Sequence, residues 1–459
     1  MADLIDLGVV DGAAALARGE LSASEWTQAC LARIGAIDGA HTFDGDPESI
    51  NAWVRLYEQD AFDAAERADQ LLARGGDDLP PLLGVPIGLK DLYEVAGKPI
   101  TASSRVMHDV PTDDCDVWRR LKAAGMILLG HLHTHEFAAG GTTDQVGNPL
   151  DLTRSAGGSS GGSAAALAAR MVPAATGTDT AGSLRIPSAC CGTSTIKPTR
   201  NLISTRGIVP LSWSLDHAGP MARSMDDCRA LLAGMLGSDH RTLRAEAPSL
   251  SGARIAVSPR AASVDLHADV AAGFERAIAA CRTVGATIIE PPPPPVGFDI
   301  ADDFLDVMTT DMLAYHRGFD DRRHHYRPSL RGWIEMGEAR ALTGEQYAAA
   351  QARRQGMTWA WSDWFYEHDI TALIEPTIPV VAPVRGTGYE HAASDYELIV
   401  LTSFWDWTGF PVAALPAGIG AATGLPVGVS LAAPTGADFA LVGLGIELQS
   451  IMGARPTQT

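Results

Sequence analysis

The amino-acid sequence predicts an α/β fold, in which short buried strands alternate with helices around a central sheet. Apolar runs bounded by Gly and Pro are typical of buried strands, and they occur at residues 83–90, 126–130, 253–257 and 286–289. Amphipathic stretches with helical periodicity separate them. The chain of 459 residues is long enough for one large domain or two to three ordinary ones, and no internal repeat or polar low-complexity linker divides it.

The first part of the chain, residues 1–75, is predicted to be helical. Ser22 and Glu25 have the spacing of a capping box at the start of one amphipathic stretch. A second amphipathic stretch spans about residues 60–74 and ends at a pair of glycines. This region is therefore expected to contribute helices rather than strands.

The second half of the chain has three recognisable patterns. Residues 291–295 are five consecutive prolines, which predict a stiff polyproline connector after a strand. Residues 300–395 carry predicted helices with many aromatic and arginine residues. Residues 414–416 and 425–431 are predicted to be closing strands.

Composition and charge exclude several classes of protein. The formal net charge of −20 repels phosphates and anionic lipid heads, which argues against nucleic-acid and membrane-surface binding. No apolar stretch approaches the roughly 20 residues of a transmembrane helix, and the acidic N-terminus does not have the pattern of a secretory signal. Six cysteines without a CxxC pair predict a reduced, cytoplasmic protein.

Lysine is rare in this sequence. Only Lys90, Lys98, Lys122 and Lys197 occur among 35 basic residues. Biased genome composition is a sufficient cause, yet each lysine is of interest because a desolvated lysine can lose its proton and an arginine cannot. Lys90 ends the apolar run 83–90, where burial would lower its pKa toward neutrality.

A Gly/Ser loop at residues 157–162 precedes a strongly helix-forming segment. Such a loop lets the backbone approach a ligand closely, and the helix N-terminus presents free N–H groups. The loop lacks the lysine of a Walker-type phosphate site. Taken alone, it is equally consistent with a tight strand-to-helix turn.

Ser183 follows a second run of small residues, and the N–H groups of its loop can converge on one oxygen, as an oxyanion hole requires. A serine nucleophile also needs a base. The sequence has no apparent G-x-S-x-G elbow with Asp and His partners, so Lys90 is the best base.

Together these motifs resemble the amidase signature family of serine hydrolases. Ser183 lies in the pattern G-T-D-x-x-G-S, 24 residues after Ser159 of the Gly/Ser loop, and this pairing is highly specific. The resemblance covers nearly the whole chain. Its matching stretches are residues 84–91, 157–170, 177–187, 196–199, 214–220, 375–380, 408–411 and 425–428.

The resemblance implies a single α/β domain over residues 1–459, with a large mixed sheet flanked by helices. Within this domain, residues 1–75 would form the helical N-terminal part and residues 80–240 the catalytic core. Residues 300–395 would form a variable helical cover over the substrate pocket.

The resemblance also implies a catalytic triad. Ser183 is the expected nucleophile, Ser159 the expected relay after a cis peptide bond, and Lys90 the expected base. Neutral Lys90 would take a proton from Ser159, which takes one from Ser183 as it attacks the carbonyl. Water would then hydrolyse the acyl-enzyme, and this mechanism requires no metal or organic cofactor.

Other residues are expected to support the triad or contact the substrate. Asp179 and Arg185 are expected to pin the nucleophile loop, and Ser160 to solvate the Gly/Ser loop or assist the relay. Lys197 is expected to make a structural ion pair. The expected oxyanion donors are the backbone N–H groups of Thr180, Ala181, Gly182 and Ser183. The expected substrate contacts are Gly140, Gly141, Phe404 and Trp405, with most aromatic residues of segments 359–366 and 404–407 in the core.

A metallohydrolase is one alternative. His131, His133 and His135 alternate in the sequence, and on a strand three such imidazoles would share a face and could ligate zinc. The corresponding family stretch commonly has Lys and Asn where histidines stand here. This departure bears on the identity of the substrate rather than on the chemistry.

A second alternative is a chain like the ammonia-releasing component of the tRNA-dependent amidotransferases, which takes ammonia from glutamine for a partner chain. The aromatic residues argue mildly against a glutamine site. We therefore expect a stand-alone amidase for small apolar or aryl amides. Aryl carbamates (urethanes), ureas and hydrazides are further expected substrates, and a homodimer is an assembly to consider.

Overall fold

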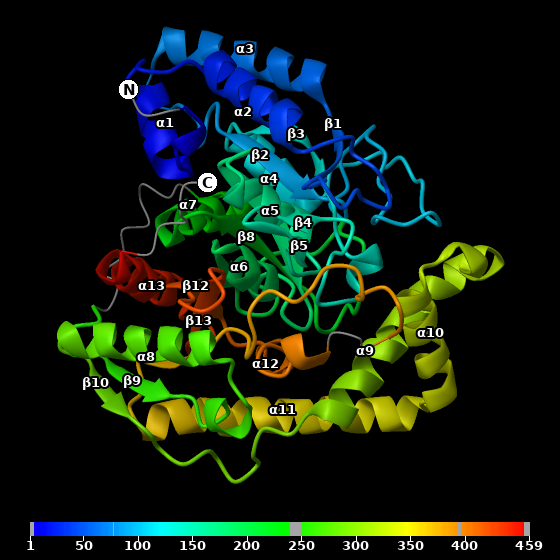
Figure 1. Cartoon of the computed structure of the whole chain (residues 1–459), viewed down its shortest axis with the longest axis vertical. Coiled ribbons are helices and arrows are strands. Elements are labelled where there is room, and N and C mark those ends of the chain that lie inside the picture. The colour runs from blue at the N-terminus through cyan, green and yellow to red at the C-terminus, as the bar shows by residue number, and fades with distance from the viewer. Residues whose placement is uncertain (1–3, 77, 239–248, 393–395, 454–459) are drawn as a thin grey trace.

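A mixed β-sheet runs through the centre of the molecule, and helices flank it (Figure 1). The computed structural model describes residues 4–76, 78–238, 249–392 and 396–453. The last positions of the predicted segments 80–240 and 300–395 lie outside these residues. The α/β fold and the mixed sheet expected from the sequence are confirmed.

Eleven of the described strands form this sheet, and two short strands pair separately. In sheet order the strands are β1 (Trp53–Leu56), β3 (Ile127–Leu132), β2 (Pro86–Lys90), β6 (Ala174–Asp179), β8 (His217–Ala222), β7 (Ser194–Lys197), β12 (Val412–Ile419), β13 (Pro426–Ala432), β11 (Ala372–Pro376), β9 (Arg254–Val257) and β10 (Thr287–Ile289). The separate pair is β4 (Gly147–Asn148) and β5 (Asp151–Ser155).

The described α-helices surround this sheet. They are α1 (Val9–Ala17), α2 (Ala23–Ile37), α3 (Glu58–Arg74), α4 (Asp116–Ala123), α5 (Gly161–Ala168), α6 (Arg185–Cys191), α7 (Met225–Leu236), α8 (Ala268–Thr283), α9 (Ala301–His316), α10 (Pro328–Arg340), α11 (Gly344–Glu367), α12 (Ser403–Thr408) and α13 (Asp438–Met452). Short 3-10 helices are η1 (Leu4–Asp6), η2 (Glu136–Ala138), η3 (Ala261–Ser263), η4 (Arg317–His325) and η5 (Tyr396–Leu398).

Two groups of parallel strands flank an antiparallel centre in this sheet, and β1 adds an antiparallel strand at one edge. β3, β2 and β6 are parallel, the strands from β6 through β11 pair antiparallel, and β11, β9 and β10 are parallel again. Every residue of β2, β3, β6 and β8 is buried. Strands buried on both faces read as continuous apolar runs, which is why residues 83–90 and 126–130 are recognisable as strands.

The N-terminal part is mostly helical, as the sequence predicts, but it also supplies an edge strand. Ser22 caps α2, its side chain accepts from the Glu25 N–H, and the Glu25 carboxylate accepts from the Ser22 N–H. Strand β1 is not expected from the sequence, because only Trp53 of its four residues is fully buried and the strand has no clear alternation. It pairs antiparallel with β3 at one edge of the sheet.

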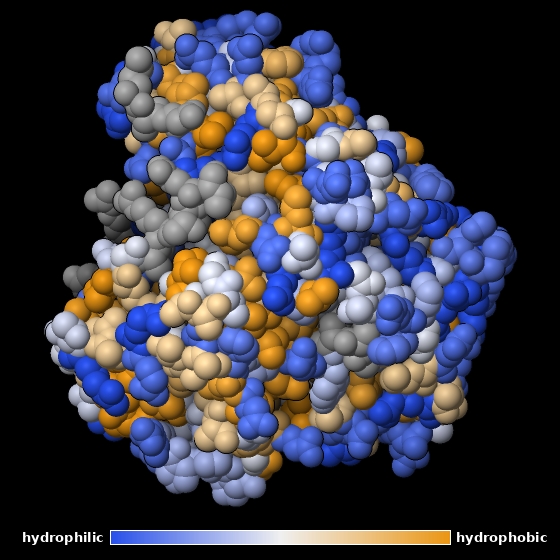
Figure 2. Space-filling model, viewed as in Figure 1, coloured by the Kyte–Doolittle hydropathy of each residue, from blue (hydrophilic) through white to orange (hydrophobic). Residues whose placement is uncertain are grey.

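On the face shown in Figure 2, polar and apolar side chains are interspersed, and apolar ones gather toward its middle. None of the described helices is long and apolar enough to span a membrane. The four lysines divide into two pairs: Lys90 and Lys197 are fully buried, whereas Lys98 and Lys122 line one surface groove between α3 and α4.

Candidate active site

Lys90 is the last residue of β2, and its side chain is fully buried beside the Gly/Ser loop. Its Nζ lies 2.7 Å from Ser159 Oγ, 2.8 Å from Thr178 Oγ1 and 2.9 Å from Ser160 Oγ. Thr178, in the adjacent strand β6, is not singled out by the sequence, although it lies within the motif that ends at Ser183. The three hydroxyls hold the amine in one place.

Burial lowers the pKa of Lys90 to about 7, against the opposing influence of Asp179 and Asp216. A neutral amine has two N–H donors and one lone pair, so with three hydroxyl partners it can donate to two and accept from the third. Accepting from Ser159 is the arrangement that a proton relay needs.

Ser159 and Ser160 lie in the loop before α5, and the Gly158–Ser159 peptide bond is cis. Glycine is required at Gly158 because a Cβ atom there would overlap the backbone of Thr142. Ser160 also contacts the β6 backbone, with its Oγ 3.4 Å from the carbonyl oxygen of Thr178. The loop therefore lies between the backbone of Thr142 and strand β6, which leads to Ser183.

Ser183 lies in the turn between β6 and α6 and is 5% exposed, with its side chain lining a cavity. No described residue forms a hydrogen bond with its hydroxyl, so the Ser159–Ser183 contact of the expected relay is not made in the free protein. Catalytic hydrogen bonds are often long in free enzymes and tighten with substrate bound. The Ser160 N–H donates to the Ser183 carbonyl at 3.3 Å, which links the two loops.

Asp179 and Arg185 form a fully buried ion pair beneath the nucleophile turn. Arg185 contacts Asp179 through Nε at 2.9 Å and Nη2 at 3.0 Å, and its Nη2 lies 2.6 Å from Asp406 of α12. Burial raises the pKa of Asp179, and the Arg185 charge opposes this shift. Asp179 also accepts from the N–H of Leu184 at 3.2 Å. The pair thus fixes the backbone on both sides of Ser183.

One of the four expected oxyanion donors, the backbone N–H of Gly182, already has a hydrogen-bond partner. The N–H of Gly182 donates to Asp179 Oδ1 at 2.5 Å and so points away from the cavity. Among the described residues, none accepts a hydrogen bond from the backbone N–H of Thr180, Ala181 or Ser183. These three groups remain available for a developing oxyanion.

Asp216 is a further, partly buried carboxyl beside this turn, and the sequence does not single it out although it lies within the matching stretch 214–220. Thr180 Oγ1 donates to Asp216 Oδ1 at 2.6 Å. The N–H groups of Leu211 and Ser212 donate to the same carboxyl at 3.0 and 3.1 Å. Burial raises the pKa of Asp216 to about 7. Asp216 therefore ties the nucleophile turn to the Leu211 segment, which lines the cavity.

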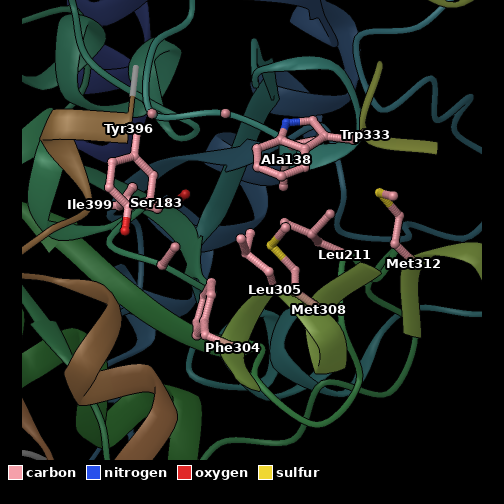
Figure 3. A pocket seen from close by; sticks show the side chains of 14 residues that line it. Ala138, Ser183, Leu211, Phe304, Leu305, Met308, Met312, Trp333, Tyr396 and Ile399 are labelled. Atoms are coloured by element: carbon pink, nitrogen blue, oxygen red, sulfur yellow. The ribbon is translucent and has the colours of Figure 1, made fainter. Parts of the chain in front are cut away.

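The cavity in front of Ser183 encloses about 540 Å³ of space, its mouth included (Figure 3). Gly140 and Gly141 line it, as expected from the sequence. The remaining large lining side chains are apolar or aromatic and come mainly from α9, α10 and the η5 region. They are Leu211, Phe304, Leu305, Met308, Met312, Trp333, Tyr396 and Ile399.

The substrate contacts expected from Phe404 and Trp405 need correction. Trp405 is fully buried and packs with Trp361, Phe404 and Phe410 in a separate aromatic core, so it does not reach the cavity. Phe404 belongs to the same core and borders a neighbouring cavity instead. Aromatic composition does not distinguish a core from a pocket wall. Phe304, Met308 and Met312 are spaced four residues apart on one face of α9, but any buried helical face has this spacing, so the sequence does not mark them as cavity lining.

The three alternating histidines do not converge. Strand β3 ends at Leu132, so only His131 lies on the strand, where it contacts the Tyr57 hydroxyl and the Tyr93 carbonyl. His133 contacts Ser103 Oγ, and His135 contacts the Thr142 carbonyl. Among the described residues, no group of three or more His, Cys, Asp or Glu side chains is arranged to hold a metal ion. The zinc arrangement considered from the sequence is therefore wrong.

Known proteins are similar to this chain in sequence and in fold. The sequence pattern of the amidase family matches residues 25–442. The chain is 31% identical to one of the subunits of the glutamyl-tRNA(Gln) amidotransferase of Streptomyces coelicolor, over 98% of this chain and 97% of that protein.

Solved structures extend this similarity to the fold. A crystal structure of an amidase superimposes with a TM-score of 0.85 and 28% identity, covering 97% of this chain and 99% of that chain. A substrate complex of 6-aminohexanoate cyclic dimer hydrolase gives 0.84 and 27%, covering 99% of both chains. The chain belongs to the amidase signature family of hydrolases, enzymes that act on carbon–nitrogen bonds.

Proposed function

We propose that the protein hydrolyses amides with an apolar or aromatic acyl group through an acyl-enzyme on Ser183. The observation that supports this substrate class is the lining of the Ser183 cavity. None of the described residues that line it carries a formal charge. Glutamine would bring a carboxylate and an ammonium group into this space, and buried charges without partners are costly. An apolar acyl group has no such cost and gains from burial.

The proposed first step is proton transfer along the two serines. Neutral Lys90 accepts the Ser159 proton while Ser159 accepts the Ser183 proton, and Ser183 Oγ bonds to the substrate carbonyl carbon. The carbonyl π electrons move to oxygen, and the N–H groups of Thr180, Ala181 and Ser183 stabilise that charge.

The proposed second half returns the protons. The Lys90 ammonium gives its proton back through Ser159 to the substrate nitrogen, the C–N bond breaks, and the amine leaves. Water then attacks the acyl-enzyme with the same relay as base, and the acid is released with Ser183 restored. The Ser183 proton leaves with the amine, and the attacking water replaces it and supplies the hydroxyl of the acid, so the cycle consumes one water.

Aryl carbamates, ureas and hydrazides are proposed as further substrates. Each has a carbonyl carbon bonded to a nitrogen leaving group, so the same Ser183 chemistry applies. The cavity lining at Phe304, Met308 and Trp333 suits an aryl group next to that carbonyl.

A fluorophosphonate probe and a substrate panel test this proposal together. We expect covalent labelling at Ser183, located by peptide mapping, and loss of labelling in Ser183→Ala. Ser188→Ala is a matched control, because Ser188 is equally buried in α6 but lies outside the cavity lining. Aryl nitroanilides should be hydrolysed faster than glutamine. Labelling at another residue, or turnover of glutamine alone, would overturn the proposal.

A second proposed function is glutamine-dependent ammonia release for a partner chain. It is favoured by the amidotransferase component of Streptomyces coelicolor, which aligns over nearly its whole length. Glutaminase activity that appears only after addition of a partner protein would support it. Full hydrolysis of aryl amides by the isolated chain would instead support the stand-alone enzyme.

We also propose a reducing, cytoplasmic location and a homodimeric assembly. All six cysteines are buried free thiols, which supports the reducing location. Size-exclusion chromatography with light scattering measures the assembly directly, against a monomer mass of 48.3 kDa.

A further inference from the structure

A second cavity lies behind one wall of the Ser183 cavity. It encloses about 930 Å³ of space, its open mouth included. The two cavities share four lining side chains, Phe304 and Leu305 of α9 and Tyr396 and Ile399 of the η5 region. We call this shared set the wall and the second space the outer cavity.

Ser183 lies close to the wall rather than at the far end of its own cavity. In Figure 3, Ser183 lies beside Tyr396 and Ile399, whereas Met312 and Trp333 lie toward the opposite end. A carbonyl carbon held at Ser183 therefore has lined space on two sides. One side is the apolar Ser183 cavity, and the other is the wall with the outer cavity behind it.

Three of the four wall side chains are exposed or only partly buried, and only Phe304 is buried. Tyr396 is 44% exposed, and no described residue forms a hydrogen bond with its hydroxyl. Leu305 and Ile399 are only partly buried. Rotation of the Tyr396 ring would break no hydrogen bond of the described protein and would widen the connection between the two spaces.

The inner part of the outer cavity suits an aromatic group, because Asp299, the one carboxylate among its described lining residues, is exposed at the border. Phe298 and Phe404 line it together with Arg260. The Arg260 charge is already balanced by Glu375 at 3.3 Å, and its Nη2 donates to the carbonyls of Val400 and Leu401. Its guanidinium lies 4.5 Å from the ring centre of Phe404, which leaves a flat, neutralised surface.

The two cavities differ in their access to solvent. The outer cavity is bordered by the exposed residues Ser263, Asp299 and Ala301. Apart from Tyr396, the described lining of the Ser183 cavity is buried or only partly exposed. The acyl group stays bonded to Ser183 through both steps, whereas the amine must leave after the first. The more open outer cavity therefore fits the departing amine.

We propose that the outer cavity binds the substituent on the substrate nitrogen, so that the enzyme's substrates are N-substituted amides with an apolar or aromatic group on both sides of the C–N bond. This inference rests on the proposed function of Ser183. Water is consumed, the C–N bond breaks, and the products are a carboxylic acid and a substituted amine instead of ammonia. A carbamate substrate would place its N-aryl group in the same space.

Two substrates with the same acyl group separate the cavities. 2-Phenylacetamide has no substituent on nitrogen and leaves the outer cavity empty, whereas N-(4-nitrophenyl)-2-phenylacetamide would fill it. Val264 lines the outer cavity and not the Ser183 cavity, so Val264→Trp fills the former without touching the triad. Ala301→Trp fills the same space from an exposed position and guards against misfolding of the first variant. Val110→Trp is the matched control, because Val110 is 57% exposed and lines neither cavity.

We expect Val264→Trp and Ala301→Trp to lower kcat/KM for the N-aryl amide by about 10- to 100-fold, the range typical of one lost apolar contact region. Their kcat/KM for the primary amide should change less than about threefold, and Val110→Trp should leave both substrates unchanged. Equal loss on both substrates, or no loss on either, would overturn the outer-cavity proposal. If wild-type enzyme hydrolyses neither substrate, the proposed function itself fails, and this result is distinct from the first two.

Discussion

Lys90 Nζ lies 2.7 Å from Ser159 Oγ, and no described carboxylate forms a salt bridge with this amine. A buried lysine beside an acid would be held in its charged form, whereas three hydroxyls stabilise a neutral amine as readily as a charged one. The position of Lys90 at the buried end of β2 thus suits the base of the proposed relay near neutral pH.

The pH dependence of kcat/KM should reflect Lys90. Because the relay needs the neutral amine and the pKa of Lys90 is lowered to about 7, we expect activity to rise with pH and to level off above about 8. Steady-state rates between pH 5.5 and 9 measure this profile. Lys90→Arg should be inactive throughout, since arginine stays protonated. A profile that falls between pH 6 and 8 would contradict a lysine base.

Ser159 and Ser160 are neighbours that both contact Lys90, and they should respond differently to substitution. Ser159→Ala removes the relay hydroxyl and is expected to lower kcat by about 10²–10⁴-fold. Ser160→Ala leaves Ser159 and Thr178 on the amine, and we expect a loss below about tenfold. Single-turnover acylation with a nitroanilide compares the two. Equal losses would mean that the two hydroxyls act interchangeably.

Arg185 is expected to be the most important charged residue for stability. Arg185→Met would leave Asp179 and Asp406 buried without their partner, which typically costs about 3–5 kcal/mol in the free energy of unfolding. Arg353→Met is the matched control, because Arg353 pairs with Asp303 at the surface. Denaturant unfolding monitored by circular dichroism measures both variants. A loss for Arg185→Met no larger than that of the control would contradict this role.

Lys197 should make stability depend on alkaline pH. Its pKa is lowered by burial to about 7, from an ordinary value of about 10.4. Between these values the unfolded chain binds one more proton than the folded protein, so the penalty for burying Lys197 is relieved as pH rises. The free energy of unfolding of the wild type should rise relative to Lys197→Met by up to about 1.4 kcal/mol per pH unit between pH 7.5 and 9.5. Urea unfolding at three pH values measures the difference, and parallel curves for the two proteins would contradict it.

The sequence identifies candidate reacting groups more readily than the cavity lining, because the candidates lie in short contiguous motifs. Lys90, Ser159 and Ser183 each lie in a short segment rich in glycine or small residues, a pattern that is recognisable in the sequence. Lys197 is expected from the sequence to form an ion pair with an acidic residue. Among the described residues, its Nζ instead forms a hydrogen bond only with the Pro198 carbonyl. That outcome depends on side-chain packing, which no local pattern contains.

The lining of the Ser183 cavity comes from helices that are distant in the sequence, and its residues resemble core residues in their sequence pattern. Met308 and Met312 are four residues apart, the spacing of any buried helical face. In the sequence, Trp405 cannot be distinguished from an aromatic residue that lines a pocket. The histidine pattern fails for a related reason. Alternation predicts a shared face only while the strand continues, and β3 ends at Leu132.

The placement of the lysines has a practical consequence for coupling chemistry. Amine-reactive reagents need an accessible ammonium group, and besides the terminal amine the chain offers only Lys98 and Lys122 at the surface. Both belong to the groove between α3 and α4, and neither borders the Ser183 cavity or the outer cavity. Immobilisation through these two lysines should therefore attach the molecule by one region and leave the Ser183 cavity and the outer cavity open.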